Sequence, residues 1–399
     1  MGGSTDETYS SSIAIDSAGH AYVAGSTSET DFPVTAGAFQ TSKKGVQDCF
    51  VTKLSPNGAS LVYSTYLGGS ENDNAYSIRV DTNGSAYVSG RAGSDFPITP
   101  GVFQESLAGD EDGFISKFSA DGTALIYSTY LGGSIALNRA VSFISAITID
   151  TAGNVYATGP TSASNFPVTP GAFQTTLKGD SSTFVTKISS DFSSLVYSTY
   201  VGGSGYDNFS IGICIDEQGN AYVTGYTKSP DFPVTPGAAQ GSYGGNGDAY
   251  VFKLSADGSA LAYSTYLGGS SDDTGCAITL ASGNRAYVSG YTYSSNFPTT
   301  PWVSPTALHG DRAAFLAIIS EDGTFFIASN YIGGDNESKA SGITLGTDGS
   351  VYITGSTNST NFPVTPGAFQ TTNHGGFDAF VYRTKFAMYA KSSVTITKL

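Results

Sequence analysis

The stretch Leu61-Val-Tyr-Ser-Thr-Tyr-Leu-Gly-Gly-Ser70 decides the fold, because it returns along the whole chain. Near-copies occur at Leu125 to Ser134, Leu195 to Ser204 and Leu261 to Ser270, with a more divergent one at Phe326 to Asp335. The chain also opens on Met1-Gly-Gly-Ser4, the end of the same phrase. The second tyrosine recurs at intervals of 64, 70, 66 and 65 residues, so we predict six copies of a unit of about 66 residues.

The composition favours strands over helices. Only 13% of the residues are charged and 13% are aromatic, while Gly, Ser, Thr and Tyr are abundant. Aromatic and β-branched residues suit a pleated surface, and Gly supplies the positive φ of tight turns. A length of 399 residues would ordinarily suggest two or three domains. Repeats at a fixed period bury a core only by stacking, so we predict one domain over 1–399.

One copy, residues 67–130, shows how each unit folds. Ile78 and Val80 alternate with smaller or polar neighbours, as in a half-buried strand. Asp81-Thr-Asn-Gly84 has the residues of a tight turn. The four predicted strands cover 76–81, 85–90, 113–118 and 124–131. The connection between the second and third strands carries Asp95-Phe-Pro-Ile-Thr-Pro-Gly-Val-Phe-Gln104, whose prolines exclude a central strand.

Four-stranded antiparallel sheets at a fixed period are typical of a β-propeller. We therefore predict an all-β, six-bladed β-propeller of four-stranded blades, with about 66 residues per blade. The predicted blades are approximately 1–66, 67–130, 131–200, 201–266, 267–331 and 332–399. The last blade needs an outer strand, and we predict that Ser392 to Lys398 supplies it. The alternative is that this tail pairs elsewhere.

The repeated phrases also resemble a known family. Tyr-Val-x-Gly, Asp-Phe-Pro-Val-Thr-Pro-Gly-Ala-Phe-Gln, Phe-Val-x-Lys and Tyr-Ser-Thr-Tyr-Leu-Gly-Gly-Ser together resemble the SBBP repeat, a β-propeller repeat of bacterial and archaeal surface proteins. The segment Ile147 to Tyr156 is also similar to NHL-type propeller repeats. The resemblance implies an exported or cell-surface propeller, generally without a defined activity.

Charge and hydropathy limit the partners. A net charge of −15 disfavours nucleic acid or an anionic membrane surface, and no run of 18 apolar residues could cross a bilayer. No charged-then-apolar leader opens the sequence, so we expect any export signal to have been removed or never present. Cys49, Cys214 and Cys276 are too scattered for a disulfide framework or a metal site. We expect them to be small buried thiols.

The first candidate site is a column of acidic residues at the end of the blades that carries the long loops. These side chains follow the Gly-Gly-Ser phrase and are Glu7, Asp73, Asp207, Asp273 and Glu337. A ring of carboxylates near the axis could hold Ca²⁺, which prefers several oxygen ligands. The alternative is that each carboxylate caps its own loop and faces water. No other cofactor is expected.

Two further candidates come from residues that depart from the repeat. Arg79 and Arg91 lie on one blade and could grip an anion together, or could pair with Asp110, Glu111 or Asp112. Exposed aromatic residues gather in the fourth and fifth copies and suit a sugar ring or a protein partner. The ones we assign to ligand binding are Tyr226, Tyr291, Tyr293 and Trp302. Alternatively, these rings fill gaps between loops.

The three histidines, His20, His309 and His374, fall in different copies and form no catalytic or metal-binding pattern. We therefore predict an extracellular or cell-surface scaffold that binds protein or glycan through its loop-rich face without catalysis. The alternative is a polysaccharide-active hydrolase or lyase that uses loop carboxylates near the central channel. A third option is a structural spacer within a larger surface protein.

Overall fold

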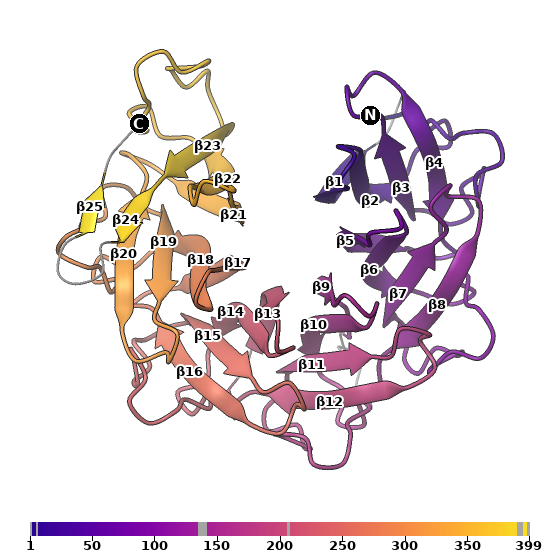
Figure 1. The fold of residues 1–399 in the computed structure, drawn as a ribbon, viewed down its shortest axis with the longest axis horizontal. Coiled ribbons are helices and arrows are strands. Elements are labelled where there is room, and N and C mark those ends of the chain that lie inside the picture. The colour runs from indigo at the N-terminus through magenta and orange to yellow at the C-terminus, as the bar shows by residue number, and fades with distance from the viewer. Residues whose placement is uncertain (1, 5–6, 135–141, 206–207, 389–393, 397–399) are drawn as a thin grey trace. The chain divides into compact units, whose positions relative to one another are not determined.

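The computed structural model describes residues 2–4, 7–134, 142–205, 208–388 and 394–396, and every regular element in them is a β-strand (Figure 1). The chain forms two compact units, Met1–Val201 and Gly202–Leu399. The all-β prediction is confirmed. Within the described ranges there is no helix long and apolar enough to cross a membrane.

The first unit contains three four-stranded sheets. Their strands are β1 (Thr8–Ile15), β2 (Ala21–Thr27), β3 (Asp48–Leu54) and β4 (Leu61–Leu67); β5 (Asn74–Val80), β6 (Ala86–Ala92), β7 (Asp112–Phe118) and β8 (Leu125–Leu131); and β9 (Ala146–Ile149), β10 (Val155–Thr161), β11 (Ser182–Ile188) and β12 (Leu195–Val201).

The second unit contains two four-stranded sheets, a three-stranded sheet and a two-stranded sheet. Their strands are β13 (Asn208–Ile215), β14 (Ala221–Thr227), β15 (Asp248–Leu254) and β16 (Leu261–Leu267); β17 (Asp273–Ala281), β18 (Arg285–Thr292), β19 (Ala313–Ile319) and β20 (Phe326–Ile332); β21 (Ser338–Leu345), β22 (Val351–Thr357) and β23 (Asp378–Thr384); and β24 (Phe386–Met388) with β25 (Val394–Ile396).

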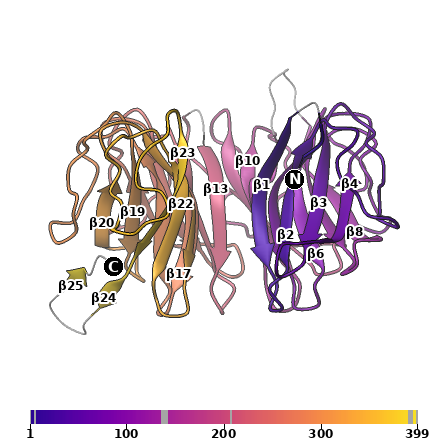
Figure 2. The same ribbon diagram turned by 90° about the horizontal axis from the view of Figure 1, so that it is seen from above.

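Each of the first six sheets is one propeller blade, numbered here from first to sixth along the chain. In every blade the strands lie in chain order and pair antiparallel, so we call them A to D. Within each unit the A strands of successive blades contact one another, as β5 contacts β1 and β9, while the D strands lie apart (Figure 1). The A–B and C–D turns emerge at one end of a blade, the turn end, and the B–C and D–A connections at the other, the loop end (Figure 2).

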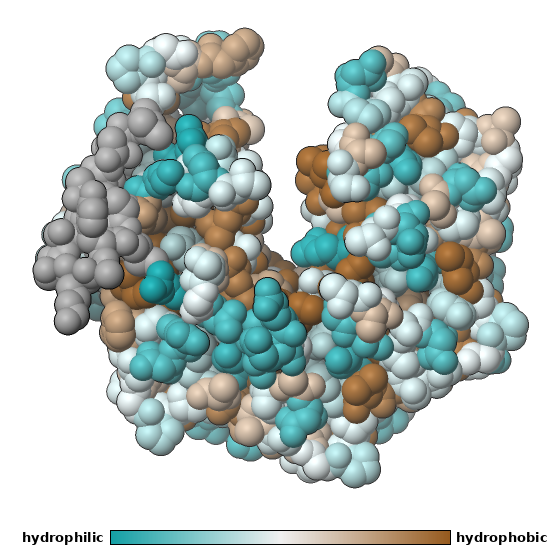
Figure 3. Space-filling view, in the orientation of Figure 1, coloured by the Kyte–Doolittle hydropathy of each residue, from teal (hydrophilic) through white to brown (hydrophobic). Residues whose placement is uncertain are grey.

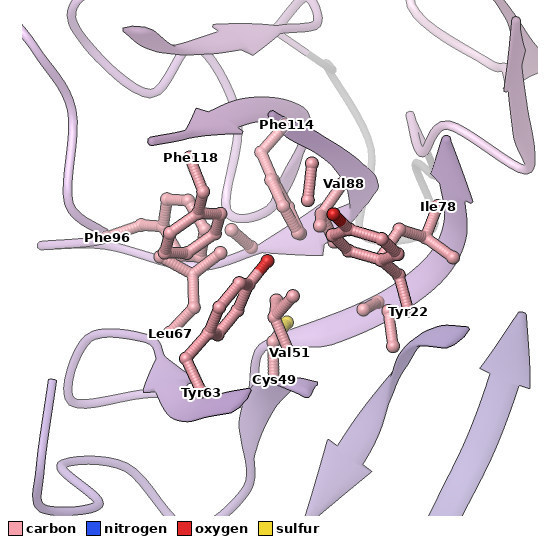
Figure 4. Packing of buried hydrophobic residues seen from close by; sticks show 14 of the residues in the cluster. Tyr22, Cys49, Val51, Tyr63, Leu67, Ile78, Val88, Phe96, Phe114 and Phe118 are labelled. Carbon is pink, nitrogen blue, oxygen red and sulfur yellow. The ribbon is translucent and has the colours of Figure 1, made fainter. Parts of the chain in front are cut away.

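Within each unit, successive blades pack face to face through aromatic and branched side chains. Between the first two blades, Tyr22, Cys49 and Tyr63 meet Ile78 and Phe118, all with 1% of their surface exposed or less (Figure 4). Burying a large apolar side chain contributes roughly 1.5–3 kcal/mol. None of the three cysteines forms a disulfide, and the expectation of buried thiols is confirmed for Cys49 and Cys276, while Cys214 is partly buried.

The long B–C connection covers the outer edge of its own blade. In the first blade, the N–H of Thr35 donates to the carbonyl of Ser64 at 3.0 Å, and the N–H of Tyr66 donates to the carbonyl of Gln40 at 3.0 Å. An uncovered edge strand offers unpaired N–H and C=O groups to other chains. The residues beyond the usual 40 to 45 per blade therefore shield strand D.

The second tyrosine of the repeated phrase holds this connection in place. Its hydroxyl donates to a loop carbonyl of the same blade at 2.7–2.9 Å in five blades, as Tyr66 to Glu29, Tyr130 to Gly93, Tyr200 to Ala163, Tyr266 to Ser229 and Tyr331 to Ser294. The ring also packs on the phenylalanine of the Phe-Pro pair, as Tyr66 does on Phe32 at 5.9 Å between centroids. The phrase that sets the period therefore joins strand D to its covering loop.

The sixth blade departs from the prediction of four strands. Its described sheet ends at β23, and β25, which lies within the predicted outer strand 392–398, pairs with β24 instead. The predicted outer strand of the last blade was therefore wrong for Val394–Ile396, and the alternative that the tail pairs elsewhere is the one observed. The reason is local, because β25 pairs antiparallel with β24, the described strand that precedes it in the chain.

Candidate functional site

The acidic column lies at the loop end, but its buried members bind their own backbone. Asp73 is fully buried and accepts hydrogen bonds from the N–H groups of Gly69 at 2.7 Å and Gly93 at 3.1 Å. Asp273 is equally buried and accepts from Gly269 at 2.7 Å and from the Ser294 hydroxyl at 2.8 Å. Each carboxylate therefore joins the D–A connection to the B–C connection through hydrogen bonds.

The remaining acidic positions do not join them. Glu337 forms an ion pair with Arg312, Glu7 is exposed, and Asp207 lies outside the described residues. Among the residues that the structure describes, no three His, Cys, Asp or Glu side chains gather as metal ligands. Calcium at this column stays a prediction without a described cluster to hold it.

A second set of carboxylates, which the sequence did not single out, lies beside the first. Asp48 and Asp248 begin strand C and accept hydrogen bonds from Gln40 at 2.8 Å and Gln240 at 3.1 Å. Asp248 and Asp273 flank Gly268 so closely that a Cβ there would lie 2.8 Å from an oxygen of each. Asp48 and Asp73 flank Gly68 in the same way. Two buried pairs of carboxyl groups therefore occupy equivalent places.

These carboxyl groups have unusual acidity. Burial raises the pKa of Asp73 to about 7 and that of Asp273 to about 6, even though their hydrogen bonds act in the opposite direction. Burial also raises the pKa of Asp248 to about 7, with a smaller contribution from the nearby charge of Asp273. Since Asp73 and Asp273 are closed off from solvent, neither can contact a polysaccharide in this structure.

The two arginines of the second blade lie apart. Arg91 is at the loop end of β6, opposite Asn74, whereas Arg79 is near the turn end of β5, opposite Tyr87. Five residues along a strand correspond to roughly 17 Å. Arg91 forms an ion pair with Glu111 at 3.0 Å, and Arg79 donates to the carbonyl of Ile78 at 2.8 Å. The structure supports the ion-pair alternative for Arg91 and does not bring the two side chains into one anion site.

Tyr291 and Tyr293, in contrast, lie next to each other. They also contact two basic residues whose proximity the sequence did not predict. The Arg312 guanidinium lies 5.3 Å from the Tyr291 ring centroid and 5.6 Å from that of Tyr293, and it donates to the Tyr293 hydroxyl at 3.0 Å. On the other side, the Lys339 ammonium lies 5.2 Å from the Tyr291 centroid. Glu337 holds Arg312 through an ion pair of 2.7 Å. We call Tyr291, Tyr293, Arg312, Glu337 and Lys339 the Tyr291 cluster.

Every member of this cluster stands at the loop end of the fifth and sixth blades. Tyr291 and Tyr293 are at the end of β18, Arg312 directly precedes β19, and Glu337 and Lys339 lie at the start of β21. The spacing along the chain hides this proximity, because the B–C connection separates the tyrosines from Arg312. Strand topology brings them together, since the end of strand B and the start of strand C lie at the same end of a blade.

Tyr226 extends the cluster toward the fourth blade. Its hydroxyl donates to the carboxylate of Asp272 at 3.2 Å, and Lys228 lies 5.6 Å from its ring centroid. The carbonyl of Asp272 in turn accepts the N–H of Tyr293 at 3.0 Å. Tyr226, Tyr291 and Tyr293, three of the four predicted aromatic residues, therefore belong to one continuous surface across three blades.

Trp302 does not belong to that surface. Its indole N–H donates to the carbonyl of Ile327 at 2.9 Å, near the beginning of β20 and thus toward the turn end. The B–C connection carries it there because this segment runs along strand D. The prediction that Trp302 shares a patch with Tyr291 was wrong for that reason, although its side chain is 52% exposed.

The turn end carries a different arrangement that is nearly the same in four blades. An Asp of the A–B turn, a Tyr of strand B and a Lys of strand C meet there. The Lys ammonium lies 3.2–3.7 Å from the carboxylate and 4.7–5.0 Å from the ring centroid, in Asp16–Tyr22–Lys53, Asp81–Tyr87–Lys117, Asp150–Tyr156–Lys187 and Asp216–Tyr222–Lys253. The sequence showed these columns separately, without showing that they meet.

In the fifth and sixth blades, the Asp and Lys positions of this arrangement change together. The fifth blade has Ala281 and Ile318 where the others have Asp and Lys, so both charges are absent together. In the sixth, Arg383 replaces the Lys and forms an ion pair of 2.9 Å with Asp348. A buried charge without its partner is costly, which explains why the two positions change together.

The fold and these sites define a chain of β-propeller blades. The family described as SBBP, beta-propeller repeat, matches residues 1–33, 62–97, 126–167 and 196–233. Four segments of the chain therefore match the SBBP repeat, as the sequence predicted. Each match after the first begins in a D strand and ends at the next Phe-Pro pair, so it crosses from one blade into the next.

More distant relatives are also recognisable. The regulatory protein FlaEY of Caulobacter vibrioides is 28% identical over 307 residues, which cover 70% of this chain but only 30% of that protein. Among solved structures, a gluconolactonase from Xanthomonas campestris has a TM-score of 0.40 and 14% identity, with 87% of this chain and 83% of that chain covered. BamB from Moraxella catarrhalis has a TM-score of 0.39 and 12% identity, with coverages of 86% and 82%.

Proposed function

We propose that this chain is an extracellular binding scaffold and that the Tyr291 cluster is its ligand site. The function is binding rather than catalysis, and the ligand is a glycan or protein that carries carboxylate groups. The single observation that carries the proposal is the stacking of two cations, Arg312 and Lys339, on the half-buried ring of Tyr291 and the exposed ring of Tyr293 at the loop end.

The chemistry of the cluster suits an acidic sugar. Aromatic rings offer flat apolar faces to a pyranose, and tyrosine adds a polar tip. The Lys339 ammonium forms no ion pair with a carboxylate in the described part of the chain, so its charge remains available to a ligand. Arg312 is already oriented by Glu337 and Tyr293, which lowers the entropy lost when it binds.

The setting of the cluster also favours binding. Loops held by a rigid scaffold are where proteins usually place binding residues. The face shown in Figure 3 carries hydrophobic side chains in small groups among polar ones. Location outside the cell rests on the resemblance of the repeats to those of surface proteins.

The test is an array of acidic and neutral polysaccharides, with polygalacturonate, alginate and hyaluronan against dextran and cellulose. We expect the full chain to bind one or more acidic polymers, and Arg312→Ala and Tyr293→Ala to weaken that binding at least tenfold. Trp302→Ala is the matched control, because it removes an exposed aromatic residue away from the cluster and should leave binding unchanged.

A protein array run in parallel separates the two ligand classes. A protein captured by the unmodified chain but not by Arg312→Ala would assign the cluster to a protein ligand. Binding that is lost in Trp302→Ala and kept in Arg312→Ala would contradict the proposed site.

A further inference from the structure

In the part of the chain that the structure describes, the sixth blade lacks the outer strand that the other five blades have. Its described sheet ends at β23, and the other two strands near the C-terminus, β24 and β25, pair with each other. In the other five blades, the repeated phrase forms strand D and pairs with strand C. The missing element is thus known in sequence and in register from five complete copies.

In the described residues, β23 pairs with β22 on one side only. Val381 is 74% exposed, but its equivalents Val51 and Val251 are buried against the blade that follows each of them, so its exposure does not report on strand D. A strand edge without a partner invites pairing with another extended segment.

The aromatic contacts of the blade are incomplete in the same place. In five blades, the phenylalanine of the Phe-Pro pair contacts an aromatic ring of strand C and the tyrosine of strand D. In the sixth blade, Phe362 and Phe380 stand 4.7 Å apart between centroids, in the usual arrangement, without the third ring. Two members of the trio are therefore already in position.

The fourth blade shows which hydrogen bonds the absent strand would make. There, the Thr235 N–H donates to the carbonyl of Ser264 at 3.1 Å, and the Gln240 N–H donates to the Thr265 hydroxyl oxygen at 2.8 Å. The Gly268 N–H donates to Gln240 Oε1 at 3.0 Å, and the Tyr266 hydroxyl donates to the carbonyl of Ser229 at 2.8 Å. The corresponding groups of the sixth blade belong to Ser359, Thr365 and Gln370. Their strand-facing atoms have no such partners in the described chain.

The side chain of Gln370 nevertheless makes the same hydrogen bonds as that of Gln240, its counterpart in the fourth blade. Its amide nitrogen donates to the carbonyl of Thr372 at 3.1 Å and to Asp378 at 3.0 Å, just as Gln240 donates to Ser242 at 3.1 Å and Asp248 at 3.1 Å. The carbonyl oxygen of its side chain is therefore already directed by the blade. Preorganised groups of this kind favour binding because little ordering remains to be done.

We propose that the outer edge of β23, with Ser359, Thr365 and Gln370, is a docking site for one extended polypeptide segment that carries the repeat's own D-strand sequence. The segment runs antiparallel to β23, its second tyrosine completes the ring trio with Phe362 and Phe380, and its Gly-Gly N–H donates to Gln370. The five D strands of the described chain are already paired in their own blades, so another segment of this sequence is the fitting partner.

The test uses the full chain and a fluorescent decapeptide with the sequence of Leu261 to Ser270. We expect saturable one-to-one binding and a higher melting temperature. Replacing the second tyrosine of the peptide by Phe should weaken binding about fivefold, since one hydrogen bond is lost. Replacing its first Gly by Pro should weaken binding by a similar factor in the unmodified chain, but by much less in Gln370→Ala, which lacks the acceptor.

On the protein side, Phe362→Ala removes one ring of the proposed trio and should weaken binding at least tenfold. Phe32→Ala is the matched control, because it removes the equivalent ring of the first blade, where strand D is present. No saturable binding, or binding unaffected by Phe362→Ala, would overturn the proposal. It would also be overturned if the chain formed dimers that Phe362→Ala dissociates while the peptide did not bind, because the edge would then pair with a second copy.

Discussion

The two ends of the blades differ in how much they vary. At the turn end, four blades repeat the same group of Asp, Tyr and Lys with nearly the same distances, and the fifth loses both charges together. At the loop end, the fifth and sixth blades carry a cluster of tyrosines and cations. The comparison indicates that the turn end stabilises each blade, whereas the loop end is where individual blades can acquire a binding role.

The largest expected effect is at the turn end. Lys253→Ala leaves the buried Asp216 carboxylate without its cation, which lies 3.2 Å away in the native chain. We expect a loss of about 3 kcal/mol in the free energy of unfolding, measured by urea denaturation.

The double variant Asp216→Ala with Lys253→Ile copies the fifth blade and sharpens the comparison. We expect it to be more stable than Lys253→Ala alone, because no unpaired charge remains. If the double variant were the less stable one, the Asp and Lys would not act as a pair.

The second effect concerns pH and the buried carboxyl groups at the loop end. Asp248 has a folded pKa of about 7 against an ordinary value of 3.8, so between these pH values the folded state binds more protons than the unfolded state. Stability therefore falls as pH rises from about 4 to about 7. We expect the free energy of unfolding to decrease by about 2 kcal/mol or more from pH 5 to pH 8.

Asp248→Asn should flatten that dependence. Oδ1 of Asp248 has no hydrogen-bond partner in the described residues, so the amide nitrogen can take its place without removing a contact. The variant should be more stable than the unmodified chain at pH 8. Parallel pH profiles for the two proteins would show that ionisation of Asp248 is not responsible.

A smaller effect is expected for the tyrosine that fastens the covering loop. Tyr200→Phe removes the hydroxyl that donates to the carbonyl of Ala163 at 2.7 Å, and that carbonyl then accepts only the N–H of Phe166, at 3.2 Å. We expect a loss of about 1 kcal/mol, and a similar loss for Tyr331→Phe in the fifth blade. Very different values in the two blades would show that the loops are not fastened in the same way.

Much of the fold could be predicted from the sequence, because the period and the alternation of side chains in residues 67–130 fix the number of units and the order of strands. The outer edge of the sixth blade was not predicted correctly. The residues Val394–Ile396 have the pattern of a strand, but the sequence does not show which strand they pair with. The separation of Arg79 and Arg91 could have been predicted, because the turn at Asp81 places them at opposite ends of a hairpin.

The candidate site was predictable only in part. Tyr291 and Tyr293 were found from their departure from the repeat, but Arg312 and Lys339 lie on other strands, and only the topology brings them to the same end. The side chain that precedes each Phe-Pro pair is another missed signal. It is Asp or Asn in all six copies, and Asp95 and Asp231 accept the N–H of a Ser in the Gly-Gly-Ser phrase.

The smallest expected change in stability belongs to the residue with the largest expected role in binding. Arg312→Ala removes one partly exposed ion pair and its ring contacts, and we expect a loss of about 0.5 kcal/mol. Thermal denaturation of Arg312→Ala and Lys253→Ala side by side measures the difference in stability between the two variants. Equal losses of stability would contradict the view that the turn end stabilises the blades more than the loop end does.

Binding of acidic polysaccharides by Arg312→Ala and by Lys253→Ala, at a temperature where both are folded, tests the central claim most directly. The loop-end variant should lose at least tenfold in affinity, while the turn-end variant should bind as the unmodified chain does despite its lower stability. Equal binding by both variants, or loss of binding in Lys253→Ala alone, would contradict the division of roles between the two ends.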